Sequence, residues 1–306
     1  MLLSIIIPIY NGAEYINRCI NNIQKNITFK DYELILINDG SSDDTNEIIL
    51  SLCNNNSHIR YFNQENHGVS YSRNIGILNA KGIWVQFLDV DDIIKDSFYQ
   101  EMYTELNKEA QLIVFNYDFC DETKKSYNNG SFNMNITYKN LKKHLFRGRY
   151  SGFIWDKIYN REYLLKNHIL FRNDLKFHED CLFNYHVFNG KPNIIYINKC
   201  LYTHYINENS VMYKFSSSRL FNHDYLKVLD CFETMLQIEK NMPINNVNLI
   251  LYSYYNYIRQ IRIKMVGCDN IKMNELEKLN NLSLNIFKKM SFPLKVLSIL
   301  KKIRIQ

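Results

Sequence analysis

The 306-residue chain contains little proline or glycine, with 4 Pro and 10 Gly. Disordered linkers are usually rich in such residues, so we expect no long linker here. The seven cysteines include no CxxC pair, and an odd, scattered set of thiols is typical of a reducing compartment. No apolar run approaches 18 residues, so no membrane-spanning helix is expected. The apolar start, residues 2–9, lacks a basic leader and a small-residue cleavage site, which favours a first strand over a signal peptide.

Acidic residues are absent from residues 281–306, which hold six of the 37 basic ones. The other 280 residues carry 31 basic and 31 acidic side chains, so the net charge of +6 belongs to this tail. The main part of the chain therefore gives no indication of nucleic acid binding. Residues 293–305 can form a basic amphipathic helix. Such a helix either lies on an anionic membrane surface or packs against the protein's own core or a partner subunit, and both interpretations stay open.

Apolar segments alternate with helical patterns in the first 90 residues. We predict strands at 4–9, 32–37, 59–63 and 82–88, and helices at 11–26, 46–53 and 68–79. This alternation predicts an α/β fold with a doubly wound, mostly parallel sheet, and the continuous apolar strands indicate burial on both faces. Later strands are predicted at 112–118, 153–159, 194–197 and 201–206. The pattern turns helical from about residue 219, and its tyrosines at 252–257 are interpreted as packing residues.

Polar motifs follow each of the first four predicted strands. They are Tyr10-Asn11-Gly12, Asn38-Asp39-Gly40, Asn66-His67-Gly68 and the run Asp89-Val90-Asp91-Asp92. Ligands bind at the carboxyl ends of the strands in open α/β sheets, so these motifs predict a binding site.

Three carboxylates stand close together in the last of these motifs, where they repel one another. One interpretation is a divalent cation, because Mg²⁺ and Mn²⁺ prefer oxygen ligands. The other is a solvated turn in which Asp92 caps the next helix. The acidic run alone does not decide between them.

Four blocks of sequence carry a family resemblance. They are SIIIPIYN at 4–11, INDGSSDDT at 37–45, NHGVSYSRN at 66–74 and FLDVDD at 87–92. In order and spacing they resemble the family-2 glycosyltransferases of bacterial surface-polysaccharide type, which have the GT-A type fold. The resemblance is close over residues 1–110 and looser to about 215. It implies a GT-A domain at 1–215, with a nucleotide-binding half at 1–110 and an acceptor-side half at 111–215, followed by a helical region at 216–306.

The resemblance implies a UDP-sugar donor with Mn²⁺ or Mg²⁺ bridging its diphosphate. It assigns the metal to Asp91, with Asp89 beside it. It further implies that Tyr10 stacks on uracil, that Asp39 binds the base or ribose, and that Arg73 reaches the diphosphate. The residues implied in donor binding within and beside these blocks are Pro8, Tyr10, Asn11, Glu14, Asp39, Gly68, Arg73, Asp89 and Asp92. Without the resemblance, Tyr10 reads as a strand-end aromatic, Asp39 as a turn residue and Arg73 as a surface charge.

A second acidic pair, Glu179-Asp180, begins a predicted helix. An inverting sugar transfer needs one general base on the acceptor hydroxyl. The resemblance assigns that base to Asp180, with Glu179 as a supporting neighbour. The competing interpretation is that both acids complement the helix N-terminus.

Two further blocks match the family more loosely, at 155–159 and 202–211. They imply that Trp155 forms an apolar wall for a sugar, that Lys157 meets phosphate, and that Ser210 binds the donor. In many relatives an Arg stands where this chain has Ile206, so a phosphate contact is lost or passes to His204 or Ser210. His204 is also a candidate metal ligand, because imidazole is a usable ligand for manganese.

These implications lead to one prediction of function with several alternatives. The chain is predicted to be an inverting, metal-dependent glycosyltransferase that moves a sugar from a UDP-sugar to a glycan or lipid-linked glycan, in surface polysaccharide synthesis. The expected location is the cytoplasm, either free or attached to the inner face of the membrane through residues 290–306. The alternatives are a protein or teichoic-acid glycosyltransferase and a non-catalytic nucleotide-sugar-binding scaffold. The donor sugar, acceptor and oligomeric state stay undetermined.

Overall fold

The computed structural model describes residues 1–120, 126–127, 136–145, 152–205, 224–239, 244–266 and 273–290. The chain forms two compact units. The first comprises Met1–Lys142 with Tyr150–Asn207, and the second Lys143–Arg149 with Glu208–Gln306. The predicted domain boundary at 215 lies outside the described residues and stays a prediction.

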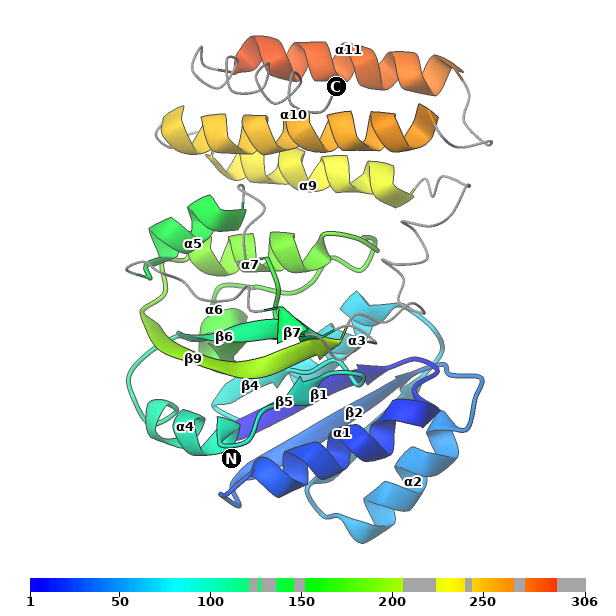
Figure 1. Cartoon of the computed structure of the whole chain (residues 1–306), viewed down its shortest axis with the longest axis vertical. Coiled ribbons are helices and arrows are strands. Elements are labelled where there is room, and N and C mark those ends of the chain that lie inside the picture. The colour runs from blue at the N-terminus through cyan, green and yellow to red at the C-terminus, as the bar shows by residue number, and fades with distance from the viewer. Residues whose placement is uncertain are drawn as a thin grey trace. The chain divides into compact units, whose positions relative to one another are not determined.

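Four parallel strands form the first half of the sheet in the order β3-β2-β1-β4. The chain runs through β1 (Leu3–Ile9), α1 (Ala13–Asn26), β2 (Tyr32–Asp39), α2 (Thr45–Asn55), β3 (Ile59–Gln64), α3 (Val69–Asn79) and β4 (Trp84–Phe87). These elements confirm the predicted alternation of strands and helices. Figure 1 shows α1 and α2 together on one side of the strands and α3 on the other.

Helices on both faces explain why the strands are continuously apolar. Every residue of β2 is buried. In α1 the buried side chains Ile16, Cys19, Ile20 and Ile23 recur at helical spacing and join the sheet's core. On the opposite face, Ile6 of β1 meets Gly76 of α3, where an added Cβ would stand only 2.4 Å from the Ile6 side chain. Gly76 therefore lets α3 approach the sheet closely.

The second half of the sheet is mixed, and its order continues from β4 to β8-β6-β9-β5. Its strands are β5 (Ile93–Ile94), β6 (Leu112–Cys120), β8 (Lys157–Asn160) and β9 (Ile194–Tyr205), and β7 (Ser126–Tyr127) pairs with β6. Both neighbours of β8 run antiparallel to it, whereas β6 and β9 are parallel. The sheet is thus parallel only in its first half. The helices of this part are α4 (Phe98–Glu105), α5 (Tyr138–Leu145), α6 (Arg161–Lys166) and α7 (Glu179–Asn189).

Two strand predictions were wrong in their bounds. The strand expected at 153–159 begins only at Lys157, because Phe153 and Trp155 belong to a preceding loop. The strands expected at 194–197 and 201–206 form the single strand β9. Its exposed polar residues Asn198 and Lys199 lie where the register with β6 shifts, so a bulge replaces the expected break.

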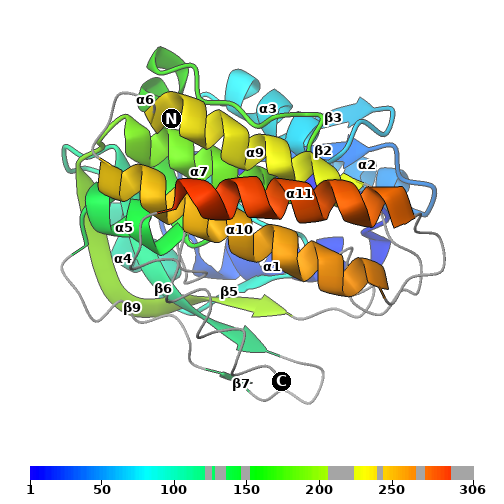
Figure 2. The same cartoon turned by 90° about the horizontal axis from the view of Figure 1, so that it is seen from above.

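The second unit contains three long helices, α9 (Asp224–Ile238), α10 (Ile244–Val266) and α11 (Met273–Lys289), which Figures 1 and 2 show lying along one another. Phe232 of α9 stacks on Tyr254 of α10 at 5.1 Å, and Tyr255 meets Phe287 of α11 at 5.5 Å. The aromatic residues of α10 therefore serve packing, as predicted. No helix in the described part of the chain is long and apolar enough to cross a membrane. The predicted tail helix at 293–305 lies outside the described residues.

Candidate active site

The loops that follow β1 and β2 are hydrogen-bonded to each other. The Asn11 amide donates to Ser41 Oγ at 2.9 Å, and Asn11 Oδ1 accepts from the Ser42 amide at 2.8 Å. Tyr10, just before this link, is 55% exposed, so its ring is available to a ligand. Pro8 is half-buried in β1, and Glu14 is exposed in the first turn of α1. These positions agree with a nucleotide site, and the individual contacts stay predictions.

Asp39 at the end of β2 is buried and fastens the loop before α3. One of its oxygens accepts hydrogen bonds from the Gln64 side chain at 2.7 Å and the His67 amide at 2.9 Å. The other accepts from the Gly68 amide at 2.8 Å. Gly68 has a φ of +90°, a conformation that favours glycine. Asp39 thus organises this loop, and its predicted contact with a base or ribose stays a prediction.

Asp92 in the acidic loop is tied to the end of β9. It is fully buried and accepts hydrogen bonds from Tyr202 Oη at 2.6 Å, His204 Nδ1 at 2.9 Å and the Tyr205 amide at 2.9 Å. The alternative in which Asp92 caps the next helix is wrong, because β5 follows it and α4 begins after Ser97. Burial raises the pKa of Asp92 in spite of its attraction to His204.

Asp89, Asp92 and His204 form a group that can hold a metal ion, since one ligand atom from each lies within 4.8 Å of the others. The donor set of carboxylate oxygens and imidazole nitrogen suits Mn²⁺. Asp92 binds Nδ1 of His204 and leaves Nε2 for a cation, an arrangement common around metal sites. Burial alone would lower the pKa of His204, but Asp92 and its neighbours raise it to about 9, so cation binding there would displace a proton. Asp91, the ligand assigned by resemblance, is not in this group and stays a prediction.

Trp155 packs against the face of the His204 ring. Its indole stacks on the His204 ring at 5.1 Å and on the Tyr202 ring at 4.9 Å, and only 3% of the residue is exposed. This burial leaves little surface for the predicted sugar wall and gives Trp155 a positioning contact with a candidate metal ligand.

Lys157 is fully buried and pairs with Asp156 at 2.5 Å, while it also donates to the Phe153 carbonyl at 2.6 Å. Burial lowers the pKa of Lys157, although Asp156 opposes that change. The predicted phosphate contact of Lys157 is not supported, because its ammonium group faces protein atoms and no solvent.

Arg73 of α3 joins the acidic loop to the start of α7. One terminal nitrogen lies 2.8 Å from Asp180 and 3.2 Å from Glu179, and the other lies 3.4 Å from Asp89. The guanidinium also lies over the Phe171 ring, with its carbon 5.4 Å from the ring centroid, and Arg73 is 4% exposed. The structure therefore binds Arg73 to three carboxylates and does not support the predicted diphosphate contact.

Asp180 and Glu179 lie in the first turn of α7 with partly exposed carboxylates, 22% and 13%. Burial raises the pKa of Asp180, and so does repulsion from Glu179 and Asp89, while Arg73 and Lys157 oppose the rise. Burial likewise raises the pKa of Glu179 against the pull of Arg73. A carboxyl group of this kind holds a proton at higher pH than an ordinary aspartate, which suits a general base.

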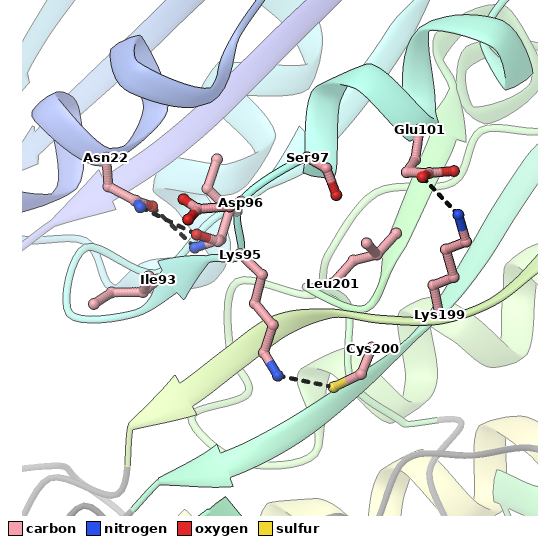
Figure 3. A pocket seen from close by; sticks show the side chains of 10 residues that line it. Asn22, Ile93, Lys95, Asp96, Ser97, Glu101, Lys199, Cys200 and Leu201 are labelled. Carbon is pink, nitrogen blue, oxygen red and sulfur yellow. Dashed lines mark hydrogen bonds and ion pairs between the residues drawn. The ribbon is translucent and has the colours of Figure 1, made fainter.

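Two residues of α1 that were not predicted from the sequence hold the acidic loop. Arg18 donates from Nη2 to the Asp91 carbonyl at 2.6 Å. Asn22, one turn later, accepts from the Ile94 amide at 3.0 Å and donates to its carbonyl at 3.1 Å. Arg18 and Asn22 are four residues apart and therefore lie on the same face of the helix. This spacing was the sequence pattern that could have indicated their shared role. Asn22 also lines a hollow of about 560 Å³ together with Lys95, Glu101 and Cys200 (Figure 3).

Comparisons with known proteins bear on the family and the fold of this chain. Residues 4–167 match the family model described as Glycosyl transferase family 2. The uncharacterized glycosyltransferase EpsJ of Bacillus subtilis is 31% identical over 217 residues, which cover 69% of this chain and 62% of EpsJ. The chain thus spans less than two thirds of that relative.

Ser210, which was predicted to bind the donor, lies outside the described residues.

Two solved structures share the fold. The crystal structure of residues 1–349 of S. aureus TarS with UDP-GlcNAc has a TM-score of 0.75 and 19% identity, over 97% of this chain and 84% of that one. The mannosyltransferase PcManGT of Pyrobaculum calidifontis, in complex with GDP-Man and Mn²⁺, has a TM-score of 0.55 and 12% identity, over 98% and 84%. Both resemblances concern the fold, which is of the GT-A type.

Proposed function

Because the chain belongs to glycosyl transferase family 2 and is a glycosyltransferase, we propose that it transfers a sugar from a UDP-sugar to a hydroxyl of a glycan, with inversion. The observation that carries this proposal is the contact of Arg73 with Asp180, Glu179 and Asp89. It brings a carboxylate of the acidic loop and the candidate base together, although Asp89 and Asp180 are 91 positions apart in the sequence.

The proposed chemistry is a single displacement at the anomeric carbon. Asp180 removes the proton from the acceptor hydroxyl, and the partly exposed carboxylate is open to that hydroxyl. Arg73 holds the Asp180 carboxylate in place from the buried side. A divalent cation held by Asp89 and His204 would stabilise negative charge on the leaving diphosphate.

The nucleotide and the cation are also proposals. TarS binds UDP-GlcNAc and PcManGT binds GDP-Man with Mn²⁺ on the same type of fold. UDP is favoured here because the blocks around Tyr10 and Asp39 resemble those of UDP-dependent enzymes. The acceptor is proposed to be a surface polysaccharide or its lipid-linked precursor, reached from the cytoplasmic face of the membrane through residues 290–306.

A donor panel tests the proposal. The full chain is incubated with UDP-glucose, UDP-galactose, UDP-GlcNAc and GDP-mannose, with Mn²⁺ or with EDTA, and the release of the nucleoside diphosphate is measured. We expect Mn²⁺-dependent release from one UDP-sugar. Asp180→Asn should reduce it about 10²- to 10⁴-fold while donor binding is kept.

The matched control is Asp174→Asn, which alters an exposed aspartate on the loop before the same helix and should keep full activity. Full activity in Asp180→Asn would contradict the role of the base. If no donor were bound or cleaved, the non-catalytic scaffold would become the better interpretation.

The membrane contact needs a separate test. Deletion of residues 290–306, followed by co-sedimentation with vesicles that contain anionic lipid, should abolish sedimentation if the basic tail binds the surface. Unchanged sedimentation would leave this part of the proposal without support.

A further inference from the structure

Arg18 places a positive charge beside the acidic loop. It lies on the second turn of α1, is exposed, and has no carboxylate partner among the described residues. Its hydrogen bond to the Asp91 carbonyl uses Nη2. The guanidinium carbon also lies over two rings, 5.6 Å from the centroid of Tyr15 and 5.3 Å from that of Tyr205. These contacts hold the guanidinium in place and leave donor hydrogens open to solvent.

The other arginine of the site is not available to a ligand. Arg73 is 4% exposed and its two terminal nitrogens face three carboxylates. Lys157 is fully buried against Asp156. Of the three described groups Arg18, Arg73 and Lys157, Arg18 is the exposed one.

Carboxyl groups outnumber cations in the described part of the site. Five carboxyl groups gather here; among the described residues Arg73 and His204 lie at ion-pair distance from them, and Lys157 acts on Asp180 from further away. The five are Asp89, Asp91, Asp92, Glu179 and Asp180. A diphosphate brought against these carboxylates is repelled, and a divalent cation offsets only part of that repulsion. The chain beyond Tyr205 supplies no basic residue before Lys214.

We propose that Arg18 binds the diphosphate of the donor, with its guanidinium held beside the acidic loop by the Asp91 carbonyl and the Tyr205 ring. This inference rests on the proposed function and adds a residue of α1 to the donor site. A guanidinium offers paired N–H donors that match phosphate oxygens, and its stacking on tyrosine limits the entropy lost on binding.

The competing explanation is that Arg18 only braces the acidic loop. The same helix offers two variants that separate the possibilities. Asn22→Ala removes a brace from the same segment without removing a charge, since Asn22 binds both backbone groups of Ile94. Lys25→Met removes one positive charge from α1 at a side chain that is 74% exposed and faces Asp96.

The test compares UDP with uridine, which lacks the diphosphate. Affinities for both are measured by titration calorimetry with the full chain in Mn²⁺, for the parent, R18M, R18K, N22A and K25M, after circular dichroism has shown that each is folded. R18M should weaken UDP binding about tenfold or more and leave uridine binding unchanged. R18K should keep part of the UDP affinity, and K25M should match the parent.

Three results would overturn the role of Arg18 and leave the proposed function intact. They are equal UDP affinity in R18M and the parent, an equal loss for UDP and uridine in R18M, and a loss in N22A as large as that in R18M. A parent chain that binds neither UDP nor uridine would instead remove the proposed function and this inference with it.

Discussion

The guanidinium of Arg73 donates to the carboxylate of Asp180 at 2.8 Å across 107 positions of sequence. The same side chain contacts Glu179 and Asp89. One buried cation thereby fixes the candidate base relative to the acidic loop, and this relationship determines how the site responds to pH and to substitution.

The activity is expected to depend on the ionisation of Asp180. Because burial and the neighbouring acids raise the pKa of Asp180, its protonated form persists above the ordinary value of 3.8. A base must lose its proton, so kcat/KM should fall as the pH falls, with a midpoint above that value. The midpoint belongs to the coupled pair of Glu179 and Asp180. Glu179→Gln should move it to lower pH, since repulsion from Glu179 raises the pKa of Asp180. A pH-rate profile measures both effects, and a midpoint near 4 in the parent would contradict them.

Removal of Arg73 is expected to destabilise the first unit. Arg73→Ala leaves Asp89, Glu179 and Asp180 without their shared partner, and breaking a buried ion pair costs about 3–5 kcal/mol. Urea unfolding followed by tryptophan fluorescence reports on this unit, because Trp84 and Trp155 both lie in it. Arg172→Ala, which breaks the more exposed pair with Asp174, should cost about 0–1 kcal/mol. If the free energy of unfolding fell no further in Arg73→Ala than in Arg172→Ala, the ion pairs of Arg73 would contribute little to the stability of this unit, which would contradict the prediction.

Cation binding is expected to depend on Asp92 although its oxygens already accept three hydrogen bonds. Asp92→Asn disturbs the contact that orients His204, and changes to such supporting residues weaken metal affinity about 10- to 100-fold. Mn²⁺ titration followed by electron paramagnetic resonance measures the affinity without any substrate. Asp96→Asn, an exposed change on the same segment, should leave it unchanged. Full sugar transfer in EDTA would argue against a cation in this site.

Stability in acid is expected to depend on Glu33. Burial alone would raise the pKa of Glu33, but hydrogen bonds from Arg60, Ser4 and the Lys81 amide lower it below 4.5. A lowered folded pKa adds stability that is complete above the unfolded value and is lost as the pH falls through the folded value. Thermal unfolding between pH 7 and pH 3 should therefore show a steeper loss for the parent than for Glu33→Gln. The exposed Glu47→Gln should follow the parent, and equal slopes for the parent and Glu33→Gln would contradict the assignment.

The first 90 residues were predictable because their strands and helices are specified by local patterns. Residues 4–9 and 32–37 are continuously apolar, and α1 repeats its apolar residues every three or four positions. Parallel order follows from such alternation, so the strand ends and their polar motifs could be placed on one edge of the sheet. The bounds of the later strands were harder to predict. β8 is short, and the two segments of β9 are joined across a bulge that no local sequence pattern predicts.

The roles of the charged residues depended on contacts that are distant in sequence. By itself the sequence determined the sheet's first half, the clustering of acids at its edge and the family to which those blocks belong. Only the tertiary structure paired Arg73 with Asp180, buried Lys157 against its neighbour Asp156, and turned Asp92 toward β9 and not toward a helix. The physical reason is that a charged side chain carries no local preference for burial. Its environment is set by whichever carboxylate or ring the fold brings within a few ångströms, and here α7 and β9 bring them.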